Sequence, residues 1–142
     1  MDDETLKDIL TEARTIAVIG CSDKAYRTSY QIAEYLKLAG YRIVPVNPHV
    51  VETLGEKAYR SMDHLPDGLE VDIVDIFRNK RYTDEMVREI AAWSEKTGQK
   101  PLIWTQLDVS TPEAKQLASA AGLPYVENKC LMVEHKRVSD ER

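Results

Sequence analysis

Cysteine is scarce in this sequence, which contains only Cys21 and Cys130 among its 142 residues. The two cysteines form neither a CxxC pair nor a zinc-ligand cluster with the three histidines, so we expect no disulfide scaffold and no metal site. His49, His64 and His135 are scattered along the chain, without a Ser or Cys partner at a spacing typical of a catalytic triad. We therefore assign no catalytic residue and interpret the histidines as surface residues.

Long apolar runs and an excess of positive charge are also missing. No run approaches the roughly 18 apolar residues that span a bilayer, and the acidic residues 1–4 lack the features of a signal peptide. We expect a cytoplasmic protein that does not bind membranes. The formal net charge is −5, which also disfavours binding to nucleic acid. An anionic ligand would have to be held by local positive charge.

Five short apolar runs are present, and helical patterns lie between most of them. The runs cover residues 16–19, 42–46, 71–77, 102–104 and 125–126. Helices are predicted over about 5–12, from 29 to 39, over about 82–97 and from 112 to 121. The segment 52–67 has weak periodicity and is interpreted as a connection with a short strand or turn.

This alternation predicts an α/β protein with a three-layer, Rossmann-like architecture. We expect an open parallel sheet of about five strands in the order 3-2-1-4-5, with helices on both faces. Residues 1–142 are expected to form a single domain, because the chain is too short for two ordinary domains.

Two details of the predicted helices stay open. The helix over about 82–97 buries either Met86, Ile90 and Trp93 or Val87, Ile90, Ala91 and Ser94. The helix from 112 begins with Thr111 as N-cap or with Ser110 and Glu113 as a capping box.

The loops after four of the runs carry the candidate binding residues. Ligands of open α/β sheets bind at the carboxyl ends of the strands, so we expect these loops to converge on one crevice. The first loop leads into a helix, whose N-terminus favours phosphate or carboxylate. The candidate residues are Gly20, Cys21, Ser22, Lys24, Arg27 and Ser29, then Val46, Asn47 and Pro48, then Phe77 and Arg78, and finally Trp104, Thr105 and Gln106.

Some of these positions have a second interpretation without a ligand. Ser29 is expected to cap the following helix, and an additional contact of its hydroxyl with a phosphate is equally open. Asn47 and Pro48 form a flat wall for an adenine or simply end a strand. Lys80 and Arg81 are either ligand contacts or solvated charges.

Acidic and thiol groups near the strand ends point more to structure than to catalysis. A helix N-terminus and nearby cations can activate a thiol such as Cys21, but a small core cysteine is the favoured interpretation. Asp72 and Asp75 lie three residues apart, which places them on opposite faces of a strand and favours structural roles over an acid pair.

The usual nucleotide fingerprints are missing as well. The first loop has Gly20 but lacks the second and third glycines of a GxGxxG motif, and Asn47 stands where NAD-binding proteins usually place an acid. A GxxxxGK[ST] motif is also missing. An NAD(P)-dependent oxidoreductase is therefore the alternative to the interpretation below.

Several phrases together resemble the small CoA-binding proteins, whose Rossmann-like domain also forms the amino-terminal part of the succinyl-CoA synthetase alpha subunit. The resemblance covers most of the chain. The matching phrases are residues 16–22, 40–48, 54–59, 71–78, 104–106 and 128–130. Each phrase alone is weak, but their order and spacing make the set specific.

The resemblance implies that the ADP portion of coenzyme A occupies the crevice, with its phosphates near residues 20–22. It implies a carrier, sensor or accessory module for coenzyme A or an acyl-CoA rather than a ligase, because the synthetase uses a phosphorylated histidine from a further domain. A scaffold with a vestigial nucleotide pocket is a further alternative. Cys21 and Cys130 raise the hypothesis of a regulatory disulfide, or of a mixed disulfide with the coenzyme A thiol.

Overall fold

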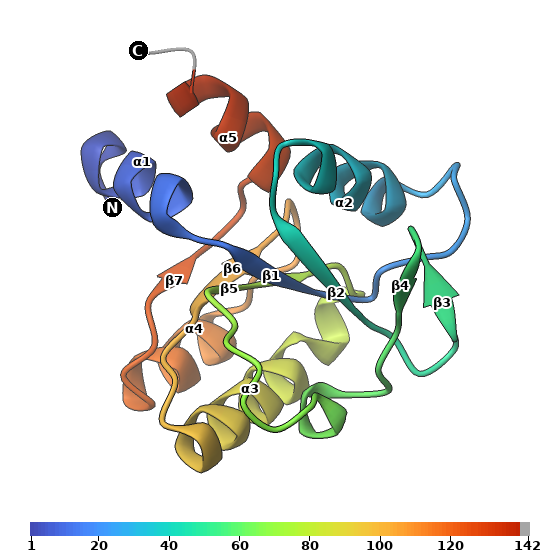
Figure 1. The fold of residues 1–142 in the computed structure, drawn as a ribbon. Coiled ribbons are helices and arrows are strands. Elements are labelled where there is room, and N and C mark those ends of the chain that lie inside the picture. Colours follow the sequence, from blue (N-terminus) through green and yellow to red (C-terminus); the bar gives the residue numbers. More distant parts are fainter. Residues whose placement is uncertain (140–142) are drawn as a thin grey trace.

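Five parallel strands form the central sheet of the computed structural model, which describes residues 1–139 (Figure 1). They are β1 (Thr15–Ile19), β2 (Arg42–Val46), β5 (Ile73–Ile76), β6 (Leu102–Thr105) and β7 (Tyr125–Val126). Their order across the sheet is β2-β1-β5-β6-β7. Every neighbouring pair is parallel, so all the strands end at the same edge of the sheet.

The segment between β2 and β5 forms a short hairpin rather than a crossover helix, as predicted. The strands β3 (Glu52–Thr53) and β4 (Glu56–Lys57) pair antiparallel, and the 3-10 turn η1 (Met62–His64) follows. Tyr59 makes one parallel bridge to Val46 beyond the edge of β2. With this bridge counted as a third strand, β5, β6 and β7 become strands 4, 5 and 6, and the order reads 3-2-1-4-5-6, which contains the predicted order 3-2-1-4-5. The difference from the label order is therefore one of numbering.

Helices cover both faces of the sheet, which confirms the predicted three-layer fold (Figure 1). On one face lie α1 (Asp3–Glu12), α2 (Thr28–Leu38) and α5 (Leu131–Ser139); on the other lie α3 (Thr83–Thr97) and α4 (Pro112–Ala120). In β5, Ile73 packs under the first group and Val74 under the second, because successive strand residues face opposite sides. Burial on both faces explains why the strands are continuous apolar runs.

The structure resolves the two open details of the helices. The buried positions of α3 include Val87, Ile90, Trp93 and Ser94, so its buried face combines parts of both predicted faces. Thr111 is the N-cap of α4, where its Oγ1 accepts a hydrogen bond from the Ala114 N–H at 3.0 Å. The predicted N-cap is therefore correct, and the capping box is not formed by Ser110, whose hydroxyl instead contacts Tyr125 and Glu127.

Helix α5 was not predicted from the sequence. It buries Leu131 and Val138, but the third buried position of the helix is Glu134, and an acidic residue breaks the apolar pattern that predicts a helix. The burial of Glu134 is explained by Arg137, which binds its carboxylate at 3.0 Å and also binds Asp3 of α1 at 2.7 Å. The ion pairs thus join the first and last helices that the structure describes.

Candidate functional site

A cleft of about 590 Å³ opens at the carboxyl ends of the strands. Its walls include Gly20 after β1, Asn47 after β2, Phe77 after β5 and Gln106 after β6. The loops that we expected to converge therefore meet at one place. This volume lies within the range of cavities that hold cofactors and other small ligands.

The structure brings many, but not all, of the candidate residues to this cleft. Those that line it are Gly20, Ser22, Arg27, Ser29, Asn47, Phe77, Arg78 and Gln106. Val46 and Pro48 instead line a smaller neighbouring cavity of about 280 Å³, which Arg78 also borders. The Lys24 side chain is 61% exposed and lies beside Asp23.

The remaining candidates, Cys21, Trp104 and Thr105, are buried in the core. Trp104 donates its indole N–H to the Lys129 carbonyl at 2.8 Å, and the Thr105 hydroxyl donates to the Val126 carbonyl at 2.8 Å. These two side chains hold β6 against the segment that leads from β7 into α5. They therefore stabilise the elements behind the cleft and do not line its surface.

Helix α2 starts at the cleft without a side-chain cap. Its N-cap residue is Arg27, and no side chain accepts a hydrogen bond from the first turn. The prediction that Ser29 caps this helix is wrong, because Ser29 is already the second helical residue and its hydroxyl accepts a hydrogen bond from the Ser22 N–H at 3.1 Å. Thr28 and Ser29 both line the cleft. An uncapped N-terminus carries unpaired N–H groups and a partial positive charge, both of which favour an anion.

The loop between β1 and α2 is held by its neighbours. The Gly20 N–H donates to the Val46 carbonyl at 2.8 Å, and the Asn47 side-chain amide donates to the Cys21 carbonyl at 3.1 Å. From the β3–β4 hairpin, the Thr53 hydroxyl donates to the Ser22 carbonyl at 2.9 Å. The loop is thus fixed from two sides, and the cleft wall is formed before any ligand arrives.

Two arginines bring positive charge to the cleft. Arg27 stands directly before α2, and Arg78 follows β5, where its guanidinium lies 4.7 Å from the ring centre of Tyr82. Lys80 lies 3.8 Å from Asp108, and Arg81 donates to the Tyr82 hydroxyl at 2.7 Å. Neither of these two residues lines the cleft, which favours their interpretation as surface charges.

The remaining residues that line the cleft are mostly apolar, and sequence reasoning missed most of them. Besides Phe77, the residues there are Ile32 of α2, Leu107 and Val109 after β6, and Cys130 before α5. Ile32 lies one helical turn beyond Thr28, so the helical spacing could have identified it. Leu107 is 66% exposed, but exposure is known only from the fold, so the sequence offered no signal for it beyond its position shortly after a strand.

The Cys21 thiol and the Asp75 carboxyl are buried near the strand ends, and neither group lines the cleft. Burial, together with the nearby charge of Asp75, raises the pKa of the Cys21 thiol to about 12. Cys21 is therefore a protonated core thiol and not a reactive thiolate. Asp75 is fully buried between Val18 and Trp104 of the adjacent strands. Burial raises the pKa of this carboxyl well above its usual range, and neither oxygen has a hydrogen-bond partner among residues 1–139.

Asp72 and two of the histidines, His64 and His135, have structural contacts. The Asp72 carboxylate accepts hydrogen bonds from the Arg14 and Thr15 N–H groups at 2.9 and 3.0 Å, which confirms its structural role. His64 contacts Ser61 at 2.7 Å. His135 is half-buried against Tyr35 and Tyr41, so it is not a simple surface residue.

Metal ligation and membrane crossing find no support in the part of the chain that the structure describes. No group of three His, Cys, Asp or Glu side chains there is placed to hold a metal ion. None of the helices described is both long and apolar enough to pass through a bilayer.

The sheet order, the uncapped helix and the arginines define a Rossmann-like domain whose cleft carries local positive charge. A dehydrogenase from Thermus thermophilus, WlbA, has the same fold with a TM-score of 0.53 over 79% of this chain and 40% of its own. At 12% identity, this likeness concerns the fold alone.

Sequence comparison identifies the family. The model of the CoA binding domain matches residues 14–136. The uncharacterized protein YneT of Bacillus subtilis is 34% identical over 130 residues, which are 92% of this chain and 91% of YneT. The Thermus thermophilus protein known as cell-free ID.343 is 36% identical, with a TM-score of 0.87 over 97% of this chain and 99% of its own. The chain belongs to the CoA binding domain family.

A larger enzyme subunit contains a region similar to part of this chain. The alpha subunit of an ADP-forming acetate–CoA ligase from Pyrococcus furiosus is 34% identical over 83 residues, which are 58% of this chain and 18% of that subunit. The similarity thus concerns less than a fifth of the ligase subunit.

Proposed function

We propose that this protein binds coenzyme A, or an acyl-CoA, as a single cytoplasmic domain that serves as a carrier, sensor or accessory module without catalysing a reaction. The uncapped N-terminus of α2 at the cleft is the observation that carries this proposal. Family membership supports the choice of coenzyme A among anionic ligands.

The cleft is lined by both charged and apolar residues, which suits a ligand with a charged part and a less polar part. Coenzyme A carries about four negative charges near neutral pH on its phosphate groups, and these fit the end with Arg27, Arg78 and the first turn of α2. The less polar pantetheine then extends along Ile32 and Val109. In this arrangement the thiol, or the acyl group attached to it, lies on the side of the cleft that leads to α5.

Calorimetric titration of the full chain with coenzyme A, NAD(H) and NADP(H) tests the proposal. We expect coenzyme A to bind at least about tenfold more tightly than either dinucleotide. Tighter binding of a dinucleotide would instead support the oxidoreductase. Failure of all three ligands to bind would support a scaffold with a vestigial pocket.

Reversing the charge at Arg27 is expected to weaken coenzyme A binding by about tenfold or more, because a charge-assisted contact to phosphate is replaced by repulsion. The same titration measures the change in Kd for Arg27→Glu. Arg88→Glu is the matched control, because Arg88 is an exposed residue of α3 outside the cleft. Equal affinities of the two variants would remove Arg27 from the site.

Coenzyme A disulfide is expected to modify Cys130 and not Cys21. Cys130 is half-buried and lines the cleft, whereas Cys21 is buried with a pKa raised to about 12. The Cys130 thiolate would attack one sulfur of the disulfide, forming a mixed disulfide and releasing the second coenzyme A as a thiolate. Intact-mass and peptide spectrometry, before and after reduction, locates the adduct. Cys130→Ser should prevent it and Cys21→Ser should not; an adduct on Cys21 contradicts this assignment.

A further inference from the structure

The amide side chain of Gln106 is a polar group of the cleft to which the proposed function gives no role. Gln106 directly follows β6, lines the cleft and is only 6% exposed. The two ends of a glutamine amide differ, because the oxygen accepts hydrogen bonds and the nitrogen donates them. Buried polar groups in proteins are normally paired. The partners of each end therefore show what Gln106 offers to a ligand.

The oxygen of the Gln106 amide is held by helix α5. Its Oε1 accepts a hydrogen bond from the N–H of Leu131, the first residue of α5, at 3.1 Å. An N–H can only donate, so the oxygen and not the nitrogen of the amide must face Leu131. Leu131 is completely buried, so a rotation of the amide would leave a buried N–H unpaired. This contact fixes the direction in which the amide points.

The nitrogen of the Gln106 amide has no partner in the protein. Nε2 makes no hydrogen bond to any of residues 1–139. Among those residues, the side-chain polar atoms that are both fully buried and unpaired are the two Asp75 oxygens. Gln106 Nε2 is not one of them, so solvent still reaches this atom, and the cleft is the cavity that Gln106 lines. The amide thus presents an unused donor to a molecule in the cleft.

The backbone around Gln106 holds this donor in place. The Gln106 carbonyl accepts from the Val109 N–H at 3.2 Å, which closes a tight turn. Within the turn, the Asp108 N–H donates to the Asn128 side chain at 3.2 Å. The end of β6 is bonded in the same way to the segment that leads into α5. A donor that is already fixed loses little freedom when a ligand binds, which favours one particular acceptor.

The neighbours of Gln106 favour an uncharged acceptor. Its contact with Leu131 places it beside the backbone of Cys130, and Cys130, Leu107 and Val109 also line the cleft. The cations that line the cleft follow β1 and β5 instead. A phosphate needs such cations when it leaves water. A neutral donor among apolar side chains suits a carbonyl oxygen with apolar groups attached to it.

We propose that Gln106 binds the thioester carbonyl of an acyl-CoA by donating a hydrogen bond from Nε2 to its oxygen. The proposal rests on the proposed function, which places the sulfur end of coenzyme A on the side of the cleft that leads to α5. The acyl chain then lies against Leu107 and Val109, and the ligand class is an acyl-CoA with an aliphatic acyl group. Free coenzyme A has only a thiol at this place, and sulfur is a weak acceptor.

Calorimetric titration of the full chain with acetyl-CoA and S-ethyl-CoA tests this contact. The two ligands share every phosphate and the whole pantetheine, and their end groups are similar in size, but S-ethyl-CoA lacks the carbonyl oxygen. We expect acetyl-CoA to bind about fivefold more tightly, which is the ratio that one neutral hydrogen bond of ordinary strength gives. In ¹⁵N nuclear magnetic resonance spectra, acetyl-CoA should shift the side-chain amide signal of Gln106 further than S-ethyl-CoA does.

Two variants of Gln106 remove the donor in different ways. Gln106→Glu retains an oxygen for the Leu131 N–H but replaces the donor with an acceptor, and Gln106→Met is uncharged. Both should lose the preference for acetyl-CoA over S-ethyl-CoA. Gln116→Glu is the matched control and should retain it, because Gln116 is an exposed residue of α4 outside the cleft. The amide spectrum of each variant reports whether it is folded.

The outcomes separate this contact from coenzyme A binding itself. Equal wild-type affinities for acetyl-CoA and S-ethyl-CoA would overturn the contact and leave coenzyme A binding in place. Equal weakening of both ligands by the Gln106 variants would also overturn it, since a bond to an amide carbonyl of the pantetheine gives that result. If neither these ligands nor free coenzyme A bind, the proposed function fails together with the contact.

Discussion

Gly20→Ala is expected to destabilise the protein by about 3 kcal/mol or more and to abolish ligand binding in the cleft. Gly20 has a φ of +83°, and a Cβ at this position would lie 2.0 Å from the Phe77 carbonyl oxygen and 2.9 Å from its carbon. Both atoms belong to backbone, so a side-chain rotation cannot relieve the overlap. The loop before α2 and the end of β5 would have to move apart, and both form walls of the cleft.

Gly98→Ala provides the matched control for this variant. Gly98 has a similar φ of +76°, but nothing lies within 4 Å of the position its Cβ would take. Alanine at position 98 therefore adds only the strain of a left-handed residue, about 1–2 kcal/mol. Urea unfolding and calorimetric titration measure the two effects. Equal losses of stability in the two variants would show that the close approach to Phe77 has no energetic weight.

Asp75→Val is expected to stabilise the protein by about 1–4 kcal/mol, because it removes a buried carboxyl without a partner and replaces it with an apolar residue that favours strands. Asp75 lies in β5 between the buried apolar residues Val18 and Trp104 of the neighbouring strands. Urea unfolding near neutral pH measures the change. A loss of stability in Asp75→Val would show that the carboxyl makes a favourable contact in solution.

Asp72→Val is the matched control and should have the opposite effect. The Asp72 carboxylate accepts hydrogen bonds from two backbone N–H groups at the start of β1, so its loss should cost about 1–3 kcal/mol. Comparing the two variants thus separates the effect of a buried carboxyl without partners from the effect of replacing an aspartate in or next to β5.

The pH dependence of stability gives an independent measure of the same carboxyl. In the unfolded chain Asp75 ionises around its ordinary value of 3.8, whereas the folded protein retains the proton to a higher pH. Between these two values the folded state binds more protons than the unfolded state, so this contribution to stability falls as pH rises and becomes constant above the folded pKa. The stability gain of Asp75→Val should therefore increase with pH through this window. A gain independent of pH would contradict the raised pKa.

The alternation of apolar runs and helices predicted the sheet because burial on both faces leaves a strong local pattern. The residues at the strand ends followed from this sheet, since parallel strands place their loops together. Helix α5 could not be predicted in the same way. Its buried Glu134 depends on Arg137 and on Asp3, which lies 134 residues from Arg137 in the sequence. Such a contact leaves no periodic signal.

The side-chain partners of Ser29 and Trp104 show a second limit of sequence reasoning. Both residues are placed correctly at the ends of their elements, but their side-chain partners depend on loops elsewhere. Ser29 contacts Ser22 across the first loop, and Trp104 donates to the Lys129 carbonyl. Local sequence therefore indicated the neighbourhood of each residue but not the direction of its hydrogen bond.

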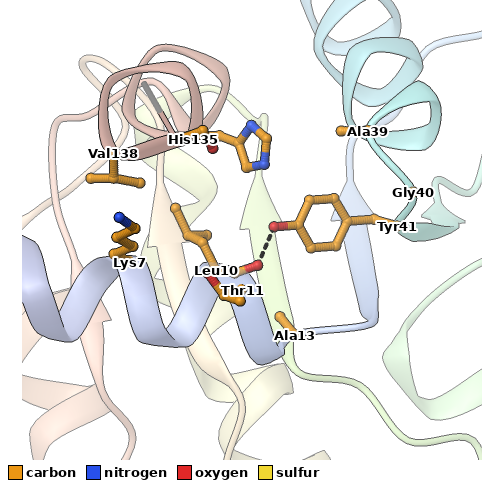
Figure 2. A pocket seen from close by; sticks show the side chains of 10 residues that line it. Lys7, Leu10, Thr11, Ala13, Ala39, Gly40, Tyr41, His135 and Val138 are labelled. Carbon is orange, nitrogen blue, oxygen red and sulfur yellow. Dashed lines mark hydrogen bonds between the residues drawn. The ribbon is translucent and has the colours of Figure 1, made fainter. Parts of the chain in front are cut away.

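Helix α5 extends from one end of the sheet to the other. Cys130, directly before its first residue, lines the cleft, and Val138, in its last turn, lines a second cavity of about 600 Å³ near the starts of β1 and β2 (Figure 2). These two residues are about 12 Å apart along the helix axis at 1.5 Å per residue. A tilt or slide of α5 as a rigid helix would therefore move a wall of the cleft and a wall of this second cavity together.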